Sequence, residues 1–241
     1  MTLDVLAFGP HPDDVELAMG GTLLKLAHRG YRTGIVDLTA GERATRGTVE
    51  GRVLEAKEAA RILNAETRVT LDLGDGRLES GWSEKLAVAE VLRRYRPRLV
   101  FTNYPENNHP DHTAAGRLVP EAAYLAGLGK LEVGGDPHRP NRVLYYFVPR
   151  TTTPSFVVDV TDFHGDKMRA IRAHRSQMFD AESTEPTTTV SAPEFLSRIE
   201  GIDRYHGALI DADFGEAFYV REAIKVEDPV LLFDQPFTRI T

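Results

Sequence analysis

The chain has 241 residues, a net charge of −7, 41% hydrophobic residues and 27% charged residues. This composition is typical of a globular protein with a full hydrophobic core. The acidic balance excludes an extended basic surface for nucleic acid or for an anionic membrane. The absence of cysteine excludes disulfides, thiolate metal sites and cysteine nucleophiles, so any metal must be held by His, Asp or Glu.

Short apolar runs alternate with helical patterns in the first half of the chain. Strands are expected at 3–8, 33–38, 68–73 and 98–103, and helices at 15–29, 49–63, 83–95 and 113–128. This alternation predicts parallel strands joined by right-handed crossovers. The expected fold is a Rossmann-like, doubly wound α/β sheet in the order 3-2-1-4-5, with helices on both faces.

The pattern becomes less regular after Gly129. Further strands are expected at 143–148, 156–160 and 218–222, and helices at 163–178 and, from a capping box at Ser191 and Glu194, to about residue 205. The polar residues 180–193 predict a mobile segment. No linker divides the chain, which predicts a single domain over 1–241, with both motifs described below in a core at 1–128 and a C-terminal extension at 129–241 that completes the sheet and pocket. No run is long enough to span a bilayer and no leader pattern opens the chain, so a cytoplasmic location is expected.

Two short motifs combine imidazoles with carboxylates. PHPDD (residues 10–14) follows the first predicted strand, and NHPDH (residues 108–112) follows the fourth. In the expected order strands 1 and 4 are neighbours, and ligands bind beyond the carboxyl ends of the strands where the winding reverses. We therefore expect the two motifs to face each other, although they lie about a hundred residues apart in the chain.

The two motifs offer six oxygen and nitrogen ligands: His11, Asp13, Asp14, His109, Asp111 and His112. Two imidazoles and one carboxylate with an open position suit a catalytic zinc ion, and other divalent ions also accept such ligands. Pro and Asp are also ordinary turn residues, and one such motif alone would not distinguish the two interpretations. Two of them at the same edge of the sheet favour a metal site.

These motifs resemble those of the LmbE/PIG-L-like superfamily, which are PHPDD after the first strand, a Gly-Gly pair in the following helix and HPDH after the fourth strand. Members of this superfamily are metal-dependent deacetylases that act on N-acetylglucosamine conjugates. Residues 41–65 and the run YRPRLVFTNYPENNHPDH are similar to bacillithiol-pathway members, which deacetylate N-acetylglucosaminyl-malate. The runs HRPNRVLYYFV, AIRAHRSQM and FGEAF fit the same subfamily, so the resemblance spans most of the chain.

The resemblance implies a role for each motif residue. His11, Asp14 and His112 are expected to hold one zinc ion per chain, or another divalent ion. Asp13 is expected to be the general base, and His109 the partner of the developing oxyanion. Asp111 is then expected to fix the tautomer of an imidazole. No role is assigned to the residues around Glu216.

Arg46 and Arg52 follow the second predicted strand, on the side of the sheet where the metal is expected. Guanidinium groups bind carboxylates, so these two residues are candidates for holding the acidic aglycone of a malate conjugate. Solvated arginines at a helix start are the alternative. The resemblance also suggests a homo-oligomer, to which the apolar residues 125–131 would contribute an interface.

Three other functions are consistent with the same residues. The substrate could be another N-acetylglucosamine compound, such as an inositol conjugate or a chito-oligosaccharide. Six potential ligands could instead hold the two metal ions of a phosphoesterase. A non-catalytic module that binds a sugar or nucleotide is the third alternative, although binding alone would not need a carboxylate beside the metal ligands.

Overall fold

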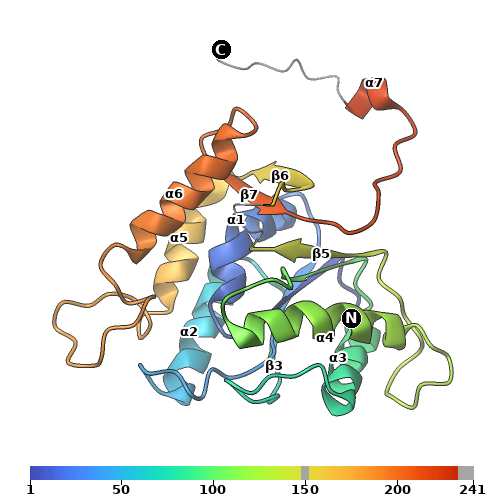
Figure 1. Cartoon of the computed structure of the whole chain (residues 1–241), viewed down its shortest axis with the longest axis horizontal. Coiled ribbons are helices and arrows are strands. Elements are labelled where there is room, and N and C mark those ends of the chain that lie inside the picture. The colour runs from blue at the N-terminus through green and yellow to red at the C-terminus, as the bar shows by residue number, and fades with distance from the viewer. Residues whose placement is uncertain (148–151, 233–241) are drawn as a thin grey trace.

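Five parallel strands form the centre of the computed structural model, which describes residues 1–147 and 152–232 (Figure 1). Their order is β3-β2-β1-β4-β5, as the sequence predicts. The strands are β1 Val5–Gly9, β2 Thr33–Asp37, β3 Thr67–Thr70, β4 Leu99–Asn103 and β5 Arg142–Tyr146. The doubly wound α/β prediction is confirmed.

Helices cover both faces of this sheet. α3 and α4 pack against each other on one face, and α1, α2 and α5 pack on the opposite face. The helices are α1 Asp14–His28, α2 Val49–Ile62, α3 Trp82–Tyr95, α4 Pro110–Ala126, α5 His164–Ala173, α6 Phe195–Ala208 and α7 Pro229–Leu232, with a short 3-10 turn at Thr161–Phe163. No helix within the described part of the chain is long and apolar enough to cross a membrane.

β1 contributes to both hydrophobic cores because successive side chains of a strand point to opposite faces. Leu6 and Phe8 join the core under α3 and α4, whereas Val5 and Ala7 join the core under α1. All five residues of β1 are buried. A strand buried on both faces reads as a continuous apolar run, which is why this one could be recognised from the sequence.

A second, two-stranded antiparallel sheet lies beside the first. It pairs β6 (Phe156–Asp159) with β7 (Gly215–Phe218), and a bridge between Tyr145 and Tyr219 connects β7 to β5. The last strand was expected at 218–222 but lies earlier, because β7 contains the buried carboxylate of Glu216, which interrupts the apolar pattern.

Several other expected boundaries were wrong. The helix expected at 163–178 ends at Ala173, because the chain turns at His174, whose side chain lies 3.1 Å from Glu16 in the interior. The Ser191–Glu194 capping box does not form, since Ser191 bonds to Thr188 instead. The third strand ends at Thr70 rather than at residue 73. Residue 148, the expected end of the fifth strand, lies outside the described residues.

A buried cluster of charges joins the C-terminal extension to α1. Lys167 of α5 is fully buried, and its ammonium lies 2.8 Å from Asp203 of α6 and 2.9 Å from Glu216 of β7. The carboxylate of Glu216 also accepts hydrogen bonds from the backbone amides of Gly21 and Thr22. These amides lie just beyond a kink in α1, at a residue with non-helical backbone angles, and the kink frees them to bind an anion.

The close approach of β6 and β7 to α1 requires a glycine at position 21. A Cβ atom added there would lie 2.8 Å from the Cβ of Val160 and 3.2 Å from a carboxylate oxygen of Glu216. Gly21 therefore permits the contact on which the buried cluster depends. The close packing of helix and sheet explains one glycine of the Gly-Gly pair.

We predict that Lys167→Met will lower the free energy of unfolding by about 3–5 kcal/mol, because it leaves two buried carboxylates without their cation. Urea denaturation at neutral pH measures this change. The exposed pair of Arg61 and Glu58 provides the control, since Arg61→Met should leave the midpoint unchanged within error. A Lys167→Met protein as stable as the wild type would contradict this account of the cluster.

Candidate metal centre and cavity

The two motifs meet because β1 and β4 are hydrogen-bonded neighbours. Val5 pairs with Leu99 and Ala7 with Phe101, so the carboxyl ends of both strands lie at the same edge of the sheet. PHPDD leaves β1 and leads into α1, and NHPDH leaves β4 and leads into α4. The predicted meeting of the two motifs is confirmed.

His11 is surrounded by carboxylates. Its Nδ1 lies 3.2 Å from Asp14, whereas its Nε2 lies 3.1 Å from Asp111 and 3.2 Å from Asp75. Burial lowers the pKa of His11, but the hydrogen bonds to these three carboxylates outweigh burial and raise the pKa to about 12. Without a metal the site therefore holds a proton on His11, which a bound cation would displace.

Asp14 joins His11 to His112. It is the first residue of α1, and its Oδ1 lies 3.2 Å from Nε2 of His112 while its Oδ2 faces His11. Burial would raise the pKa of Asp14, but the charge on His112 and the hydrogen bonds from both imidazoles lower it well below its usual range. Asp14 is therefore the ionised centre of the group.

Asp13 lies beside this group with a different environment. Its backbone has a φ of 122°, in a region that residues with side chains rarely adopt. Its closest cation is Arg52, at 3.8 Å. Burial and the charge of Asp14 raise the pKa of Asp13 to about 6, even though Arg52 lowers it. Adjacent aspartates thus have opposite pKa shifts.

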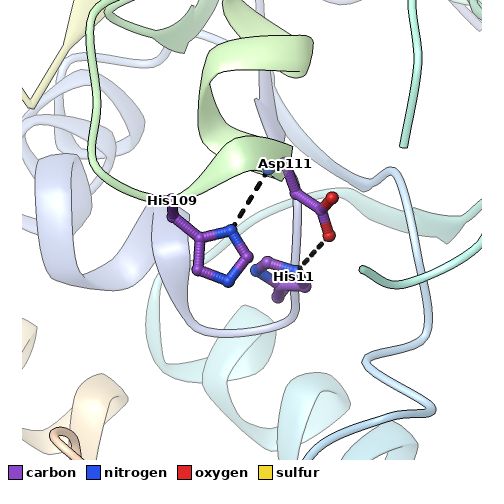
Figure 2. Close-up of side chains that lie close together, drawn as sticks. All are labelled: His11, His109 and Asp111. Carbon is purple, nitrogen blue, oxygen red and sulfur yellow. Dashed lines mark hydrogen bonds and ion pairs between the residues drawn. The ribbon is translucent and has the colours of Figure 1, made fainter. Parts of the chain in front are cut away.

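His109 faces the same group from α4, as the helix N-cap (Figure 2). Its ring centroid lies 5.0 Å from that of His11 and 4.8 Å from that of His112. Nδ1 of His109 accepts a hydrogen bond from the Asp111 amide, which places the proton of the neutral ring on Nε2. Burial and the charges on His112 and His11 lower the pKa of His109, so the ring offers a donor while neutral.

Asp111 is held rigidly on the far side of His11. Its carboxylate accepts hydrogen bonds from the amides of Gly76 and Leu78 and contacts Nε2 of His11, as Figure 2 shows for the last contact. Burial would raise the pKa of Asp111, but the hydrogen bonds from His11 and Gly76 outweigh burial and lower it. This is the geometry expected of a carboxylate that fixes an imidazole.

Asp75 also belongs to the site, although the sequence analysis assigned it no role. It lies in a Gly-Asp-Gly turn beyond β3, and the hydrogen bond from His11 lowers its pKa. Its backbone amide donates to Glu42, while its side chain accepts from the amide of Arg43. Its position beyond the carboxyl end of a strand was the signal that could have identified it.

The donor atoms fit a divalent cation. One nitrogen or oxygen from each of His11, Asp14 and His112 can be chosen so that all three lie within 4.8 Å of one another. In addition, Nδ1 of His112 is buried and has no hydrogen-bond partner within residues 1–147 and 152–232. A second group, formed by His11, His109 and Asp111, meets the same criterion but also requires His11. Among the described residues, the two groups share a ligand and do not form two separate sites.

Two cavities adjoin this centre and share a wall. The polar cavity, of about 410 Å³, is named for its charged residues Asp13, Arg43, Arg52 and Asp75. The apolar cavity, of about 270 Å³, is named for Ala18, Ile202 and Ala217, although Asp203 and Glu216 also line it. The residues common to both linings are Leu17, His112, Phe147 and Ile199. A molecule that reaches His112 can therefore extend into either cavity.

The two predicted substrate-binding arginines differ in their surroundings. Arg52 lines the polar cavity, although its guanidinium also donates to the carbonyls of Gly41 and Pro12. Arg46 does not line it. The guanidinium of Arg46 is buried and donates to the Ser176 carbonyl and to the Ser183 hydroxyl, so it fastens the 176–186 segment to the loop after β2.

Comparison with known proteins identifies the family. A profile of PIG-L, described as GlcNAc-PI de-N-acetylase, matches residues 6–123. Diacetylchitobiose deacetylase of Thermococcus kodakarensis is 36% identical over 188 residues, which cover 72% of this chain and 69% of that protein. The chain belongs to the PIG-L family. This confirms the resemblance noted from the two motifs.

Two further PIG-L relatives differ in how closely they match. A probable N-acetyl-alpha-D-glucosaminyl L-malate deacetylase 2 of Bacillus cereus is 28% identical over 197 residues, covering 73% of this chain and 84% of that protein. The crystal structure of a conserved protein of Thermus thermophilus has a TM-score of 0.84 and 39% identity, and covers 94% of this chain and 98% of that one. The PIG-L fold therefore extends over nearly the whole sequence.

We predict that Asp13→Asn will stabilise the metal-free protein by about 1–3 kcal/mol at pH 7. The pKa of Asp13 rises from 3.8 to about 6 on folding, so ionised Asp13 opposes folding at neutral pH. The gain should shrink as the pH falls through 6 and vanish below 3.8, where Asp13 is protonated in both states. Urea denaturation of chelator-treated protein across this range measures it.

Asp162→Asn, the same substitution at an exposed position, provides the matched control. A stability difference for Asp13→Asn that does not change with pH would contradict the assignment of the raised pKa to this carboxyl.

Proposed function

We propose that this protein is a metal-dependent hydrolase that removes the acetyl group from an N-acetylglucosamine conjugate. The observation that carries the proposal is a compact ligand group of His11, Asp14 and His112 with a second carboxylate, Asp13, beside it. Membership of the PIG-L family supports the same chemistry. A phosphoesterase with two ions is less compatible, because the two possible ligand groups both require His11.

We propose zinc as the metal, with one ion per chain held by His11, Asp14 and His112. Two imidazoles and one carboxylate with an open position are typical of catalytic zinc. A bound divalent ion supplies Lewis-acid chemistry, in that it polarises a carbonyl and lowers the pKa of water. Asp111 would keep His11 oriented through its contact with Nε2.

The remaining groups would carry the proton transfers. Asp13 is free of the ligand group, and its raised pKa suits a base that takes a proton from the attacking water and returns it to the amine. Nε2 of His109 would donate a hydrogen bond to the carbonyl oxygen as negative charge develops there. The bond from the Asp111 amide to Nδ1 would keep that donor in place.

For the aglycone we propose malate, as the sequence indicates. Arg43 and Arg52 support this choice, because both line the polar cavity and can bind carboxylates. Arg43 is exposed and is the better candidate to replace Arg46, whose guanidinium is bonded to the 176–186 segment. The apolar cavity supports a second candidate, a neutral disaccharide such as diacetylchitobiose, the compound named for the Thermococcus relative. The single domain and the cytoplasmic location remain predictions from the sequence.

We predict that His112→Ala will lose metal and activity together, whereas Asp13→Asn will keep the metal. General acid–base catalysis typically contributes about 10²–10⁴-fold, so kcat of Asp13→Asn should fall by that amount. Metal analysis of the purified proteins, with acetate release as the assay, separates the two effects. Two tightly bound ions per chain, both needed for activity, would favour the phosphoesterase, and loss of metal from Asp13→Asn would make Asp13 a ligand.

We predict that acetate release will be faster from N-acetylglucosaminyl-malate than from diacetylchitobiose or the inositol conjugate. Arg43→Ala should lower kcat/KM for the malate conjugate by about ten- to a hundredfold, the effect of one charged hydrogen bond. The matched substrate is its dimethyl ester, for which the variant should match the wild type. Arg52→Ala should slow all substrates, because Arg52 also holds the Pro12 carbonyl.

An equal loss on the acid and its ester would show that Arg43 does not bind the carboxylates. Faster release from diacetylchitobiose would exclude malate and leave the deacetylase proposal intact.

A further inference from the structure

The chain ends, within its described part, in an arm that leaves the body of the protein. Residues 222–232, which include α7, extend away from the layers of sheet and helices (Figure 1). Every hydrogen bond described for these residues joins two members of the arm, such as Lys225 to Glu227 and Val230 to Asp228. Nothing in the described body of the chain is hydrogen-bonded to the arm in this position.

The arm exposes apolar side chains that a folded protein normally covers. Val230 and Leu231 are 74% and 73% exposed, and Ile224 and Leu232 are more than half exposed. Single exposed apolar residues are common on protein surfaces, but four large aliphatic residues on one short segment form a patch. The arm is also acidic, since residues 222–232 contain three carboxylates and one lysine.

A groove at the surface of α3 and α4 has the complementary character. Trp82 and Tyr124 are 61% and 60% exposed and line a hollow of about 450 Å³. Its other lining residues are Lys85, Arg117, Pro120, Glu121, Leu125 and Arg221. Lys85 pairs with Glu121, and the charge of Arg117 also acts on that carboxylate, while Arg221 lies over the Tyr145 ring. The groove thus combines exposed aromatic rings with three cations and a single carboxylate, Glu121.

The start of the arm lies at this groove. Arg221, the residue before the arm, lines the groove, and its guanidinium lies 5.0 Å from the centre of the Tyr145 ring. In a two-fold dimer each contact occurs twice, so a segment that begins beside its own groove can cross to the same groove on the partner. Eleven fully extended residues can span at most about 35 Å, which is the longest distance that the arm could cross to a partner.

We propose that the arm of one chain docks in the Trp82–Tyr124 groove of a second copy of the same chain, so that two copies exchange arms. The apolar residues of α7 would cover the two aromatic rings. Glu222 and Asp228 of the arm would approach Arg117 and Arg221 of the groove. This occupant explains the exposed apolar arm, the exposed rings and the excess of cations in the groove together, and it is independent of the proposed reaction.

The absence of native cysteine makes a direct test possible. Leu231→Cys and Tyr124→Cys are purified separately under reducing conditions, mixed and oxidised. Arm exchange predicts a disulfide-linked dimer that contains one chain of each variant. Arg61→Cys, on the exposed face of α2, replaces Tyr124→Cys in the control mixture and should give a yield at least about tenfold lower. Similar yields in the two mixtures would overturn the proposal.

A second measurement uses no cysteine. Sedimentation of the wild type should reveal a dimer or a larger even-numbered assembly, and Val230→Asp with Leu231→Asp should raise its dissociation constant at least about tenfold. Arg117→Glu should weaken association in the same direction and make it less dependent on salt. A wild type that is monomeric at micromolar concentration would overturn the proposal. So would an assembly unaffected by these substitutions, or a disulfide that forms within one chain of a Leu231→Cys/Tyr124→Cys double variant.

Discussion

Negative charge concentrates around one imidazole, and the rest of the site depends on how that charge is balanced. Asp14, Asp75 and Asp111 all lie within 3.2 Å of His11. Carboxylates so close together repel one another, and burial strengthens the repulsion by removing water. In the metal-free protein a proton on His11 offsets this repulsion, and a divalent cation would offset it with more positive charge. The three carboxylates around His11 therefore favour the binding of a cation, whether or not a substrate is present.

The same charges shift the pKa values of two adjacent residues, Asp13 and Asp14, in opposite directions. Asp14 points toward His11 and His112 and stays ionised, whereas Asp13 is left with one cation at 3.8 Å and a pKa of about 6. The φ of 122° at Asp13 carries a cost typical of strained residues in functional sites. The strained backbone and the raised pKa of this buried carboxyl therefore both lower stability at neutral pH.

The sequence could predict the order of the strands and the meeting of the two motifs, because both follow from local patterns and one topological rule. The position of Asp75 beyond the carboxyl end of a strand could have made it a candidate. Its contact with His11 could not be predicted, since a Gly-Asp-Gly turn looks the same whether or not an imidazole lies beside it. Arg46 was misjudged for a similar reason. An isolated arginine carries no sign of whether its guanidinium meets a substrate or the carbonyls of its own chain. The last strand was expected too late in the chain, because a charged residue such as Glu216 is not expected inside a buried strand. Its partner, Lys167, lies 49 residues earlier in the chain.

The two cavities share a wall, so the proposed metal site adjoins two spaces that a bound molecule could occupy. His112 and Phe147 face both cavities, and their rings are nearly parallel, at 8°. Of the three proposed ligands only His112 lies on this wall, since His11 and Asp14 line the polar cavity alone. A molecule bound at His112 could therefore extend either toward Arg43 and Arg52 or into the apolar cavity that ends in Asp203 and Glu216. Arg43 and Arg52 would offer cations to an anionic aglycone in the first cavity, although Asp13 and Asp75 also line it. Leu17 and Ile202 would offer apolar contact to a sugar ring in the second. Substitutions at Arg43 or Ile202, which line one cavity each, would therefore change the molecule that binds without altering any residue of PHPDD or NHPDH.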